Sequence, residues 1–469
     1  MKRYVIYTLF FWATMSLMSC TKYLEVNPDN RVRLTTVEDY QAVVTGAYPE
    51  AYHHFTELFT DNYRYYDYPS YNNVSITNLL FPIYLWSDNY VGNSAIGPEA
   101  AWRKYYNDIY EANVVLEGID DAIGDDALRQ SVKAEAYMIR AYCHFMLVNI
   151  YAKAYDPSTA ATDLGVPYAL EAEKEPGTYY KRDNIQYVYD RIEEDALKAL
   201  DMIHEEFMRI PKYHWSRASI HAFLSRFYLF KEDWDQSLYH SEEVLKLNSS
   251  IRNLFADYDN YYVSGDYIGF ANRYFDTHQG NVLLVNYTLT WNPYERGSLY
   301  ANEFKATFHV NDVRGKIYTY WSAQTPNYVA RKFRRSFPDG QSFADVALFV
   351  VEEVMYNAAE AAVRKDNPDF QYAIDKLNAI LMERWRPYVA LKKEDYPTKE
   401  ALLEKIIDEK NRELCYEGYR WFDIKRFDIP VSHWDGTQYQ ELPPDDPRRL
   451  VQIPFAELNA NPLMEPNPR

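Results

Sequence analysis

Aromatic and polar side chains gather in two stretches of the chain, where they could bind a ligand together. The residues singled out are Asp61, Arg64, Tyr65, Tyr68, Trp86 and Asn89 in the first stretch, and Tyr267, Trp291, Tyr294, Arg296 and Trp321 in the second. Sugar rings present flat C–H faces and a rim of hydroxyls, which suits aromatic rings set beside polar groups. We therefore predict a carbohydrate site built from these residues. The competing interpretation is that the rings pin their loops to the scaffold.

Carboxylates are abundant, but their spacing does not suit catalysis. Pairs such as Asp120–Asp121, Glu193–Glu194 and Glu352–Glu353 are adjacent in the sequence, so the two side chains of each pair face different directions on a helix. Nucleophile, phosphate-loop and dinucleotide motifs are absent from the sequence, and no cysteine or histidine cluster has metal-ligand spacing. We expect a non-enzymatic protein without metal or cofactor. The enzymatic alternative, a surface glycosidase, would need two carboxylates about 5–10 Å apart in a cleft.

The amino-acid composition limits the classes of partner and of fold that this chain can have. A formal charge of −18 repels nucleic acids and anionic ligands, so we expect no nucleic-acid partner. Only 15 of 469 residues are glycine, which argues against a β protein with many turns, whereas tyrosine is abundant at 46 residues. Cys143 and Cys415 lie in helical patterns and are interpreted as buried thiols.

The first twenty residues predict export and a lipid anchor. Lys2 and Arg3 precede an apolar run from residue 4 to residue 17 that is too short to span a membrane. The run leads into Leu-Met-Ser-Cys20, which looks like a bacterial lipobox. We expect residues 1–19 to be a signal peptide, Cys20 to be acylated, and residues 20–33 to form a tether. The alternative is an ordinary signal peptide with an incidental cysteine.

Helical spacing of apolar residues predicts the scaffold. It recurs over residues 34–54, 100–247 and 342–426, and Thr36 with Asp39 forms a capping-box signature at the first helix. Helices over 214–230 and 234–247, and again over 342–364 and 370–385, have the length and spacing of tetratricopeptide hairpins. Residues 55–99 and 248–340 lack a sustained period and are predicted to be long irregular insertions that carry the ligand site. We expect residues 34–469 to form one all-α domain.

Three motifs resemble one known family. The segment 406–426 resembles the hallmark of the SusD/RagB family, residues 453–462 resemble its closing motif, and residues 133–142 resemble an early family helix. The hallmark positions are Glu417, Gly418, Arg420, Trp421, Phe422, Asp423 and Arg426. From their residue types alone, Glu413, Glu417 and Arg420 would tie a helix end to its neighbour rather than catalyse a reaction.

The resemblance implies a fold and a function. It implies an all-α, SusD-like fold with about four degenerate tetratricopeptide hairpins and long loop insertions. It also implies a lipoprotein on the outer face of the outer membrane that binds glycans without altering them. The implied partner is a SusC-like TonB-dependent β-barrel transporter. Two alternatives remain open at this point: the same fold binding peptides, as in RagB-like proteins, and a structural tetratricopeptide adaptor without a small ligand.

Overall fold

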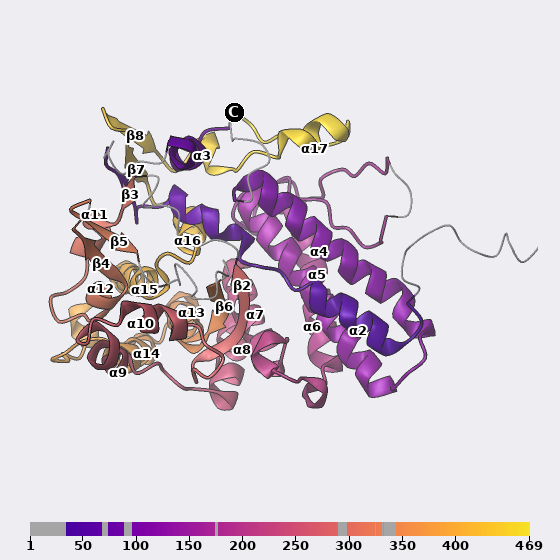
Figure 1. Ribbon diagram of the computed structural model, residues 1–469, viewed down its shortest axis with the longest axis horizontal. Coiled ribbons are helices and arrows are strands. Elements are labelled where there is room, and N and C mark those ends of the chain that lie inside the picture. The colour runs from indigo at the N-terminus through magenta and orange to yellow at the C-terminus, as the bar shows by residue number, and fades with distance from the viewer. Residues whose placement is uncertain are drawn as a thin grey trace, which may run out of the picture. The chain divides into compact units, whose positions relative to one another are not determined.

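The computed structural model describes residues 34–67, 74–88, 96–173, 177–288, 298–323, 325–330, 332 and 344–469. The chain divides into two units, Met1–Thr35 and a compact unit over Thr36–Arg469. The helices and strands described here belong to the second unit. This unit is mostly helical (Figure 1), which confirms the predicted fold class. None of its described helices is long and apolar enough to cross a membrane.

The first group of helices follows the sequence prediction closely. Thr36 and Asp39 form the predicted capping box at the start of α2 (Val37–Gly46). Helices α4 (Pro98–Gly118), α5 (Asp126–Tyr151) and α6 (Ile185–Met202) follow, and α5 packs against α2, α4 and α6. Because α5 lies among these three helices (Figure 1), its C-terminal half is buried on every side, including Cys143. The predicted burial of this thiol is therefore confirmed.

A second group of helices forms consecutive packed pairs. α7 (Arg217–Phe230) packs on α8 (Trp234–Leu247), and α13 (Val351–Arg364) packs on α8, α14 (Phe370–Leu381) and α15 (Lys399–Leu414). Ala358, Ala359 and Ala361 on α13 are fully buried, so small side chains let these helices approach closely. α16 (Arg420–Arg426) and α17 (Phe455–Ala460) complete the C-terminal part. The helix pairs fit the predicted hairpins, whereas the tetratricopeptide assignment itself stays a prediction.

One predicted helix is partly wrong. Residues 344–350, expected to open a helix over 342–364, form strand β6 (Ala344–Val350), which pairs antiparallel with β2 (Val282–Thr288). The helix α13 starts only at Val351. The run Val-Ala-Leu-Phe-Val is apolar and rich in β-formers, so its period does not distinguish a buried strand from a helix. Pairing with β2, which is distant in the sequence, makes this segment a strand.

The predicted insertions contain short regular elements rather than only irregular loops. The first holds η1 (Tyr52–Phe59), β1 (Arg64–Tyr65) and α3 (Val74–Tyr84). The second holds α9 (Leu254–Asp257), η5 (Tyr258–Tyr262), α10 (Tyr267–Arg273), β2, β3 (Leu299–Tyr300), α11 (Asn302–Ala306), α12 (Arg314–Ile317), β4 (Thr319–Ser322) and β5 (Asn327–Ala330). A further hairpin, β7 (Val431–Trp434) with β8 (Tyr439–Leu442), follows α16. Single 3₁₀ turns lie at η2 (Ile119–Asp121), η3 (Glu205–Phe207), η4 (Pro211–Tyr213), η7 (Lys393–Asp395) and η8 (Pro447–Arg449).

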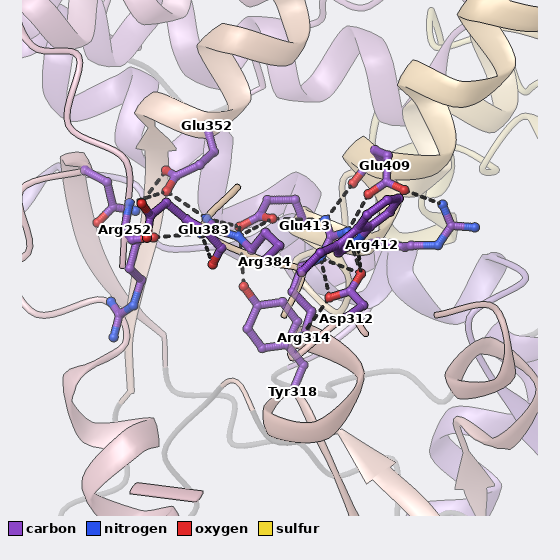
Figure 2. Close-up of polar contacts among 12 residues, drawn as sticks. Arg252, Asp312, Arg314, Tyr318, Glu352, Glu383, Arg384, Glu409, Arg412 and Glu413 are labelled. Carbon is purple, nitrogen blue, oxygen red and sulfur yellow. Dashed lines mark hydrogen bonds and ion pairs between the residues drawn. The ribbon is translucent and has the colours of Figure 1, made fainter. Parts of the chain in front are cut away.

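A buried ion-pair network ties the second insertion to the helices (Figure 2). The Arg314 guanidinium binds Asp312 at 2.7 Å and also pairs with Glu409 and Glu413 of α15. Arg384 lies beside it and bonds Glu413 at 2.8 Å and Glu352 of α13 at 3.0 Å. These side chains are at most 4% exposed. Burial alone would oppose ionisation of Glu413, but Arg384 and Arg314 hold its pKa down at about 2.

The family-like segment after α15 has the structural role expected from its residue types. Glu417 binds Lys332 at 2.7 Å, and Arg420 binds Asp61 through two nitrogens at 2.8 and 3.0 Å. The backbone N–H of Gly418 donates to Glu57 at 2.9 Å, which fixes η1 against the turn. Ion pairs and hydrogen bonds from this turn therefore hold both insertions against the helical scaffold.

Candidate ligand-binding site

Short strands bring the two predicted insertions together. β1 pairs antiparallel with β3, with Arg64 opposite Tyr300 and Tyr65 opposite Leu299. β1 also contacts β7, and β3 contacts β5, so the C-terminal hairpin joins the same region. Figure 1 shows β3, β4, β5, β7 and β8 gathered on one side of the unit, away from α2, α5 and α6. Three stretches that are far apart in the sequence therefore share one surface.

Arg64 lies at the centre of this surface. Its guanidinium lies 5.4 Å from the ring centres of Tyr66 and Trp434 and 5.5 Å from that of Tyr439. One guanidinium nitrogen donates to Glu303 of α11 at 2.9 Å, and the Tyr66 hydroxyl donates to the same carboxylate oxygen at 2.7 Å. We call these five residues the Arg64 surface. It combines flat rings, a cation and an acceptor in one place.

The Arg64 surface is open to solvent. The side chains of Arg64 and Glu303 are 30% and 48% exposed, and Tyr439 is 53% exposed. Arg64 Nε has no hydrogen-bond partner among the described residues. Donors on Arg64 and acceptors on Glu303 can therefore meet ligand hydroxyls while the rings cover an apolar face. The chemistry of this arrangement suits a polar, hydroxylated molecule, and Glu303 is its one carboxylate.

Trp321 adds a second exposed ring near α11. It is 54% exposed on β4 and contacts Tyr328 of β5 edge to face at 5.2 Å. The backbone N–H of Tyr328 bonds the Asn302 side chain, one residue before Glu303. The predicted residue Trp321 is thus accessible and lies on elements adjacent to the Arg64 surface.

Trp86 is a correction to the predicted site. It is only 2% exposed, its ring stacks on His433 at 4.2 Å, and its Nε1–H donates to the Phe59 carbonyl at 3.2 Å. Tyr84 stacks on the other side of His433 at 4.1 Å. The indole therefore fastens β7 to the first insertion, and its face is not available for a ligand.

Asp61 and Tyr65 also serve packing in this structure. Asp61 has Arg420 as its bidentate partner, although its side chain is 42% exposed. The Tyr65 ring lies 4.8 Å from that of Phe81 and close to Gly436. Both residues flank the Arg64 surface and stabilise the elements that carry it.

For several residues of the predicted site, the structure does not describe the side chain. Tyr267 starts α10, and its side chain is left undescribed. The residues outside the described ranges are Cys20, Tyr68, Asn89, Trp291, Tyr294 and Arg296. Their predicted roles remain predictions.

Sequence reasoning missed Glu303, Trp434 and Tyr439, and it did not single out Tyr66. For Trp434 and Tyr439, the local sequence did contain a signal. Trp434 and Tyr439 flank Asp435-Gly436, a turn pair that indicates a β-hairpin, and Gly436 has φ +103°. Cross-strand pairing then places Trp434 opposite Tyr439. Nothing local indicates that this hairpin lies against Arg64.

The mostly helical fold of this chain is similar to the folds of several solved structures. The "Putative sugar binding protein" of Bacteroides vulgatus aligns with a TM-score of 0.72 at 21% identity, covering 93% of this chain and 99% of that one. The "SusD-like carbohydrate binding protein" of the same species aligns with a TM-score of 0.70 at 18% identity over 92% and 98% of the two chains. At these identities the likeness concerns the fold.

Family models identify the relationship. A model described as "Starch-binding associating with outer membrane" matches residues 22–229, and the SusD family model matches residues 283–469. The curated SusD-like protein P25 of Formosa agariphila is 27% identical over 166 residues, which is 31% of this chain and 30% of that protein. The chain belongs to the SusD/RagB family.

Proposed function

We propose that this chain is a non-catalytic, cell-surface nutrient-binding protein that binds oligosaccharides and delivers them to a SusC-like TonB-dependent transporter. The supporting observation is the Arg64 surface, on which both insertions and the C-terminal hairpin converge. The family model names starch binding, and two solved relatives are described as sugar or carbohydrate binding. These descriptions support the ligand class for this chain.

The chemistry of the surface suits a glycan. A sugar ring can lie against Tyr439 or Trp434 with its C–H face, because Tyr439 is 53% exposed and Trp434 is half-buried on the same hairpin. The hydroxyl groups at the edge of the sugar ring can then accept hydrogen bonds from Arg64 and donate hydrogen bonds to Glu303. Glu303 is the one carboxylate of the Arg64 surface, so the surface lacks the paired acids that glycoside hydrolysis requires.

The location and partner follow from family membership and from the N-terminal sequence. The family description refers to association with the outer membrane. A lipid on Cys20 would hold the compact unit at that membrane through the 20–33 tether, facing outwards. A ligand released from the Arg64 surface would then pass directly to the transporter.

Binding measurements on the full-length protein test this proposal. Calorimetry with a panel of neutral oligosaccharides is expected to identify at least one ligand. Trp434→Ala and Tyr439→Ala are each expected to weaken it about tenfold, the scale expected for a buried aromatic contact. Tyr239→Ala is the matched control, because Tyr239 is 52% exposed on α8. Equal affinity in all variants, or binding of cationic peptides instead of sugars, would contradict the proposal.

A further inference from the structure

A groove lies along the exposed side of α4, separate from the Arg64 surface. Its volume is about 960 Å³, at the upper end of the roughly 300–1,000 Å³ typical of small-ligand sites. Its walls come from η1, α4, the described residues of 167–173 and 177–180, and α17 with the residues beside it. None of the residues of the Arg64 surface lines it.

The groove is held in shape by hydrogen bonds between its walls. The Tyr106 hydroxyl of α4 donates to the Pro167 carbonyl at 2.9 Å. Asn113 donates to the Ala169 and Glu171 carbonyls at 3.1 and 3.2 Å. On the opposite side, Asn461 after α17 donates to the Tyr180 carbonyl at 2.9 Å. These contacts fix the loop at both ends, so a ligand would not have to order the walls on binding.

Asp108 gives the groove a polar group that is only partly satisfied. It lines the groove, is only 5% exposed, and its Oδ2 has no hydrogen-bond partner among the described residues. Burial raises the pKa of Asp108 to about 8, so this carboxyl is mostly protonated at neutral pH. A buried carboxyl group without a full set of partners costs free energy. A ligand hydroxyl would satisfy it.

The remaining lining favours a neutral, hydroxylated ligand. Tyr110 and Tyr179 are 36% and 51% exposed and line the groove. Rings of this kind can cover the C–H faces of sugars. The charged lining residues carry both signs: Glu99, Arg103, Lys104, Glu171, Glu173 and Glu457. An ion of either sign would meet like charge in the groove, whereas a neutral ligand would not.

We propose that the α4 groove is a second site for neutral oligosaccharides, with Tyr110 and Tyr179 as stacking rings and Asp108 as a partner for a sugar hydroxyl. This inference rests on the proposed function as a glycan-binding protein. A second site on the same unit would hold a glycan at two points along its length or keep a second chain nearby. Two linked sites increase the apparent affinity without any further contact.

Calorimetry and hydrogen exchange on the full-length protein test the groove. The probes are maltoheptaose, cellohexaose, xylohexaose and mannohexaose. A groove variant carries Tyr110→Ala with Tyr179→Ala, a surface variant carries Arg64→Ala with Trp434→Ala, and Tyr239→Ala is the control. For a sugar that binds, the groove variant is expected to lose about half of the bound ligand. Hydrogen exchange over residues 98–110 should slow with sugar in the surface variant and not in the groove variant.

Asp108→Asn provides a second test with little change in shape. It is expected to weaken groove binding about threefold to tenfold, because an amide satisfies the ligand hydroxyl less well than the acid in this place. An unchanged stoichiometry in the groove variant, with no protection of residues 98–110, would overturn the second site and leave the proposed function intact. Loss of all binding in the groove variant alone would support the groove and displace the Arg64 surface. Failure of every sugar to bind the wild-type protein would overturn both proposals.

Discussion

At the scale of single residues, Asp108 differs from the buried acids Glu409 and Glu413. Glu409 and Glu413 have arginine partners, and the pKa of each stays near 2 even though burial opposes ionisation. Asp108 is paired with no arginine in the described structure, and burial raises its pKa to about 8. The arginines outweigh burial at Glu409 and Glu413, whereas burial outweighs the single Lys332 partner of Glu417, whose pKa rises to about 7, and likewise prevails at Asp108.

The raised pKa of Asp108 predicts a pH dependence of stability. The unfolded carboxyl titrates near ~3.9, so between about pH 4 and pH 8 the folded state binds the proton more tightly. Stability should therefore fall as the pH rises through this window. Asp108→Asn removes this pH dependence. In urea unfolding, the stability of the variant relative to that of the wild type should therefore rise by about 1–3 kcal/mol between pH 5 and pH 8.

Asp435→Asn is the control with the opposite sign. The Gln438 backbone N–H and neighbouring donors lower the pKa of Asp435, so its ionised form stabilises the fold above the unfolded pKa. This variant should lose stability at neutral pH, and the loss should shrink as the pH falls below the unfolded pKa. A pH-independent difference for Asp108→Asn would contradict the assignment of a raised pKa.

Gly418 supports a second prediction at this scale. It has φ +85°, and an added Cβ would lie 3.0 Å from the His53 carbonyl oxygen. Gly418→Ala should therefore reduce the free energy of unfolding by about 2–4 kcal/mol, from backbone strain and this contact together. Gly265 has φ +76° and no described atom within 4 Å of such a Cβ, so Gly265→Ala should cost only about 1 kcal/mol. Equal losses in urea unfolding would exclude a role for the His53 contact.

At the scale of elements, buried ion pairs join segments that lie far apart in the sequence. Arg314 is the first residue of α12, Glu352 lies on α13, Arg384 follows α14, and Glu413 lies in the last turn of α15 (Figure 2). Such pairs fix the position of the second insertion, because leaving one charge without its partner is costly in the interior.

Glu413→Gln tests this network. It removes the charge shared by Arg314 and Arg384, and we expect a loss of about 3–5 kcal/mol in the free energy of unfolding. Asp259→Asn breaks the exposed pair with Arg386, whose side chains are both 52% exposed, and should cost about 0–1 kcal/mol. A small loss for both variants would show that packing, rather than the charges, positions the insertion.

At the scale of the whole molecule, the proposed role requires attachment to the cell surface. Cys20 is the predicted lipid attachment site, and the compact unit starts at Thr36. Cys20→Ser should move the protein from the membrane fraction to the soluble fraction and abolish labelling with radioactive palmitate. Glycan binding by the variant should not change, because the Arg64 surface lies within the compact unit. Unchanged membrane attachment would contradict lipidation at this residue.

Local sequence determined much of the scaffold. The Thr36–Asp39 capping box, the apolar period of α4 to α8 and the glycine after α15 each depend on interactions within a few residues. The family-like motif at 406–426 likewise indicated the fold, because its residues tie neighbouring elements together. The fold class and the family were therefore predictable from sequence.

Only the tertiary structure decided which aromatic rings face solvent. Trp86 and Trp434 are each followed by polar residues in the sequence, yet Trp86 is buried against His433 while Trp434 contacts the half-buried Arg64. The strand at 344–350 likewise depends on β2, and the Arg64 surface depends on strands from three distant stretches. Burial and pairing between distant segments are set by long-range packing, and the period of a local sequence does not contain that information.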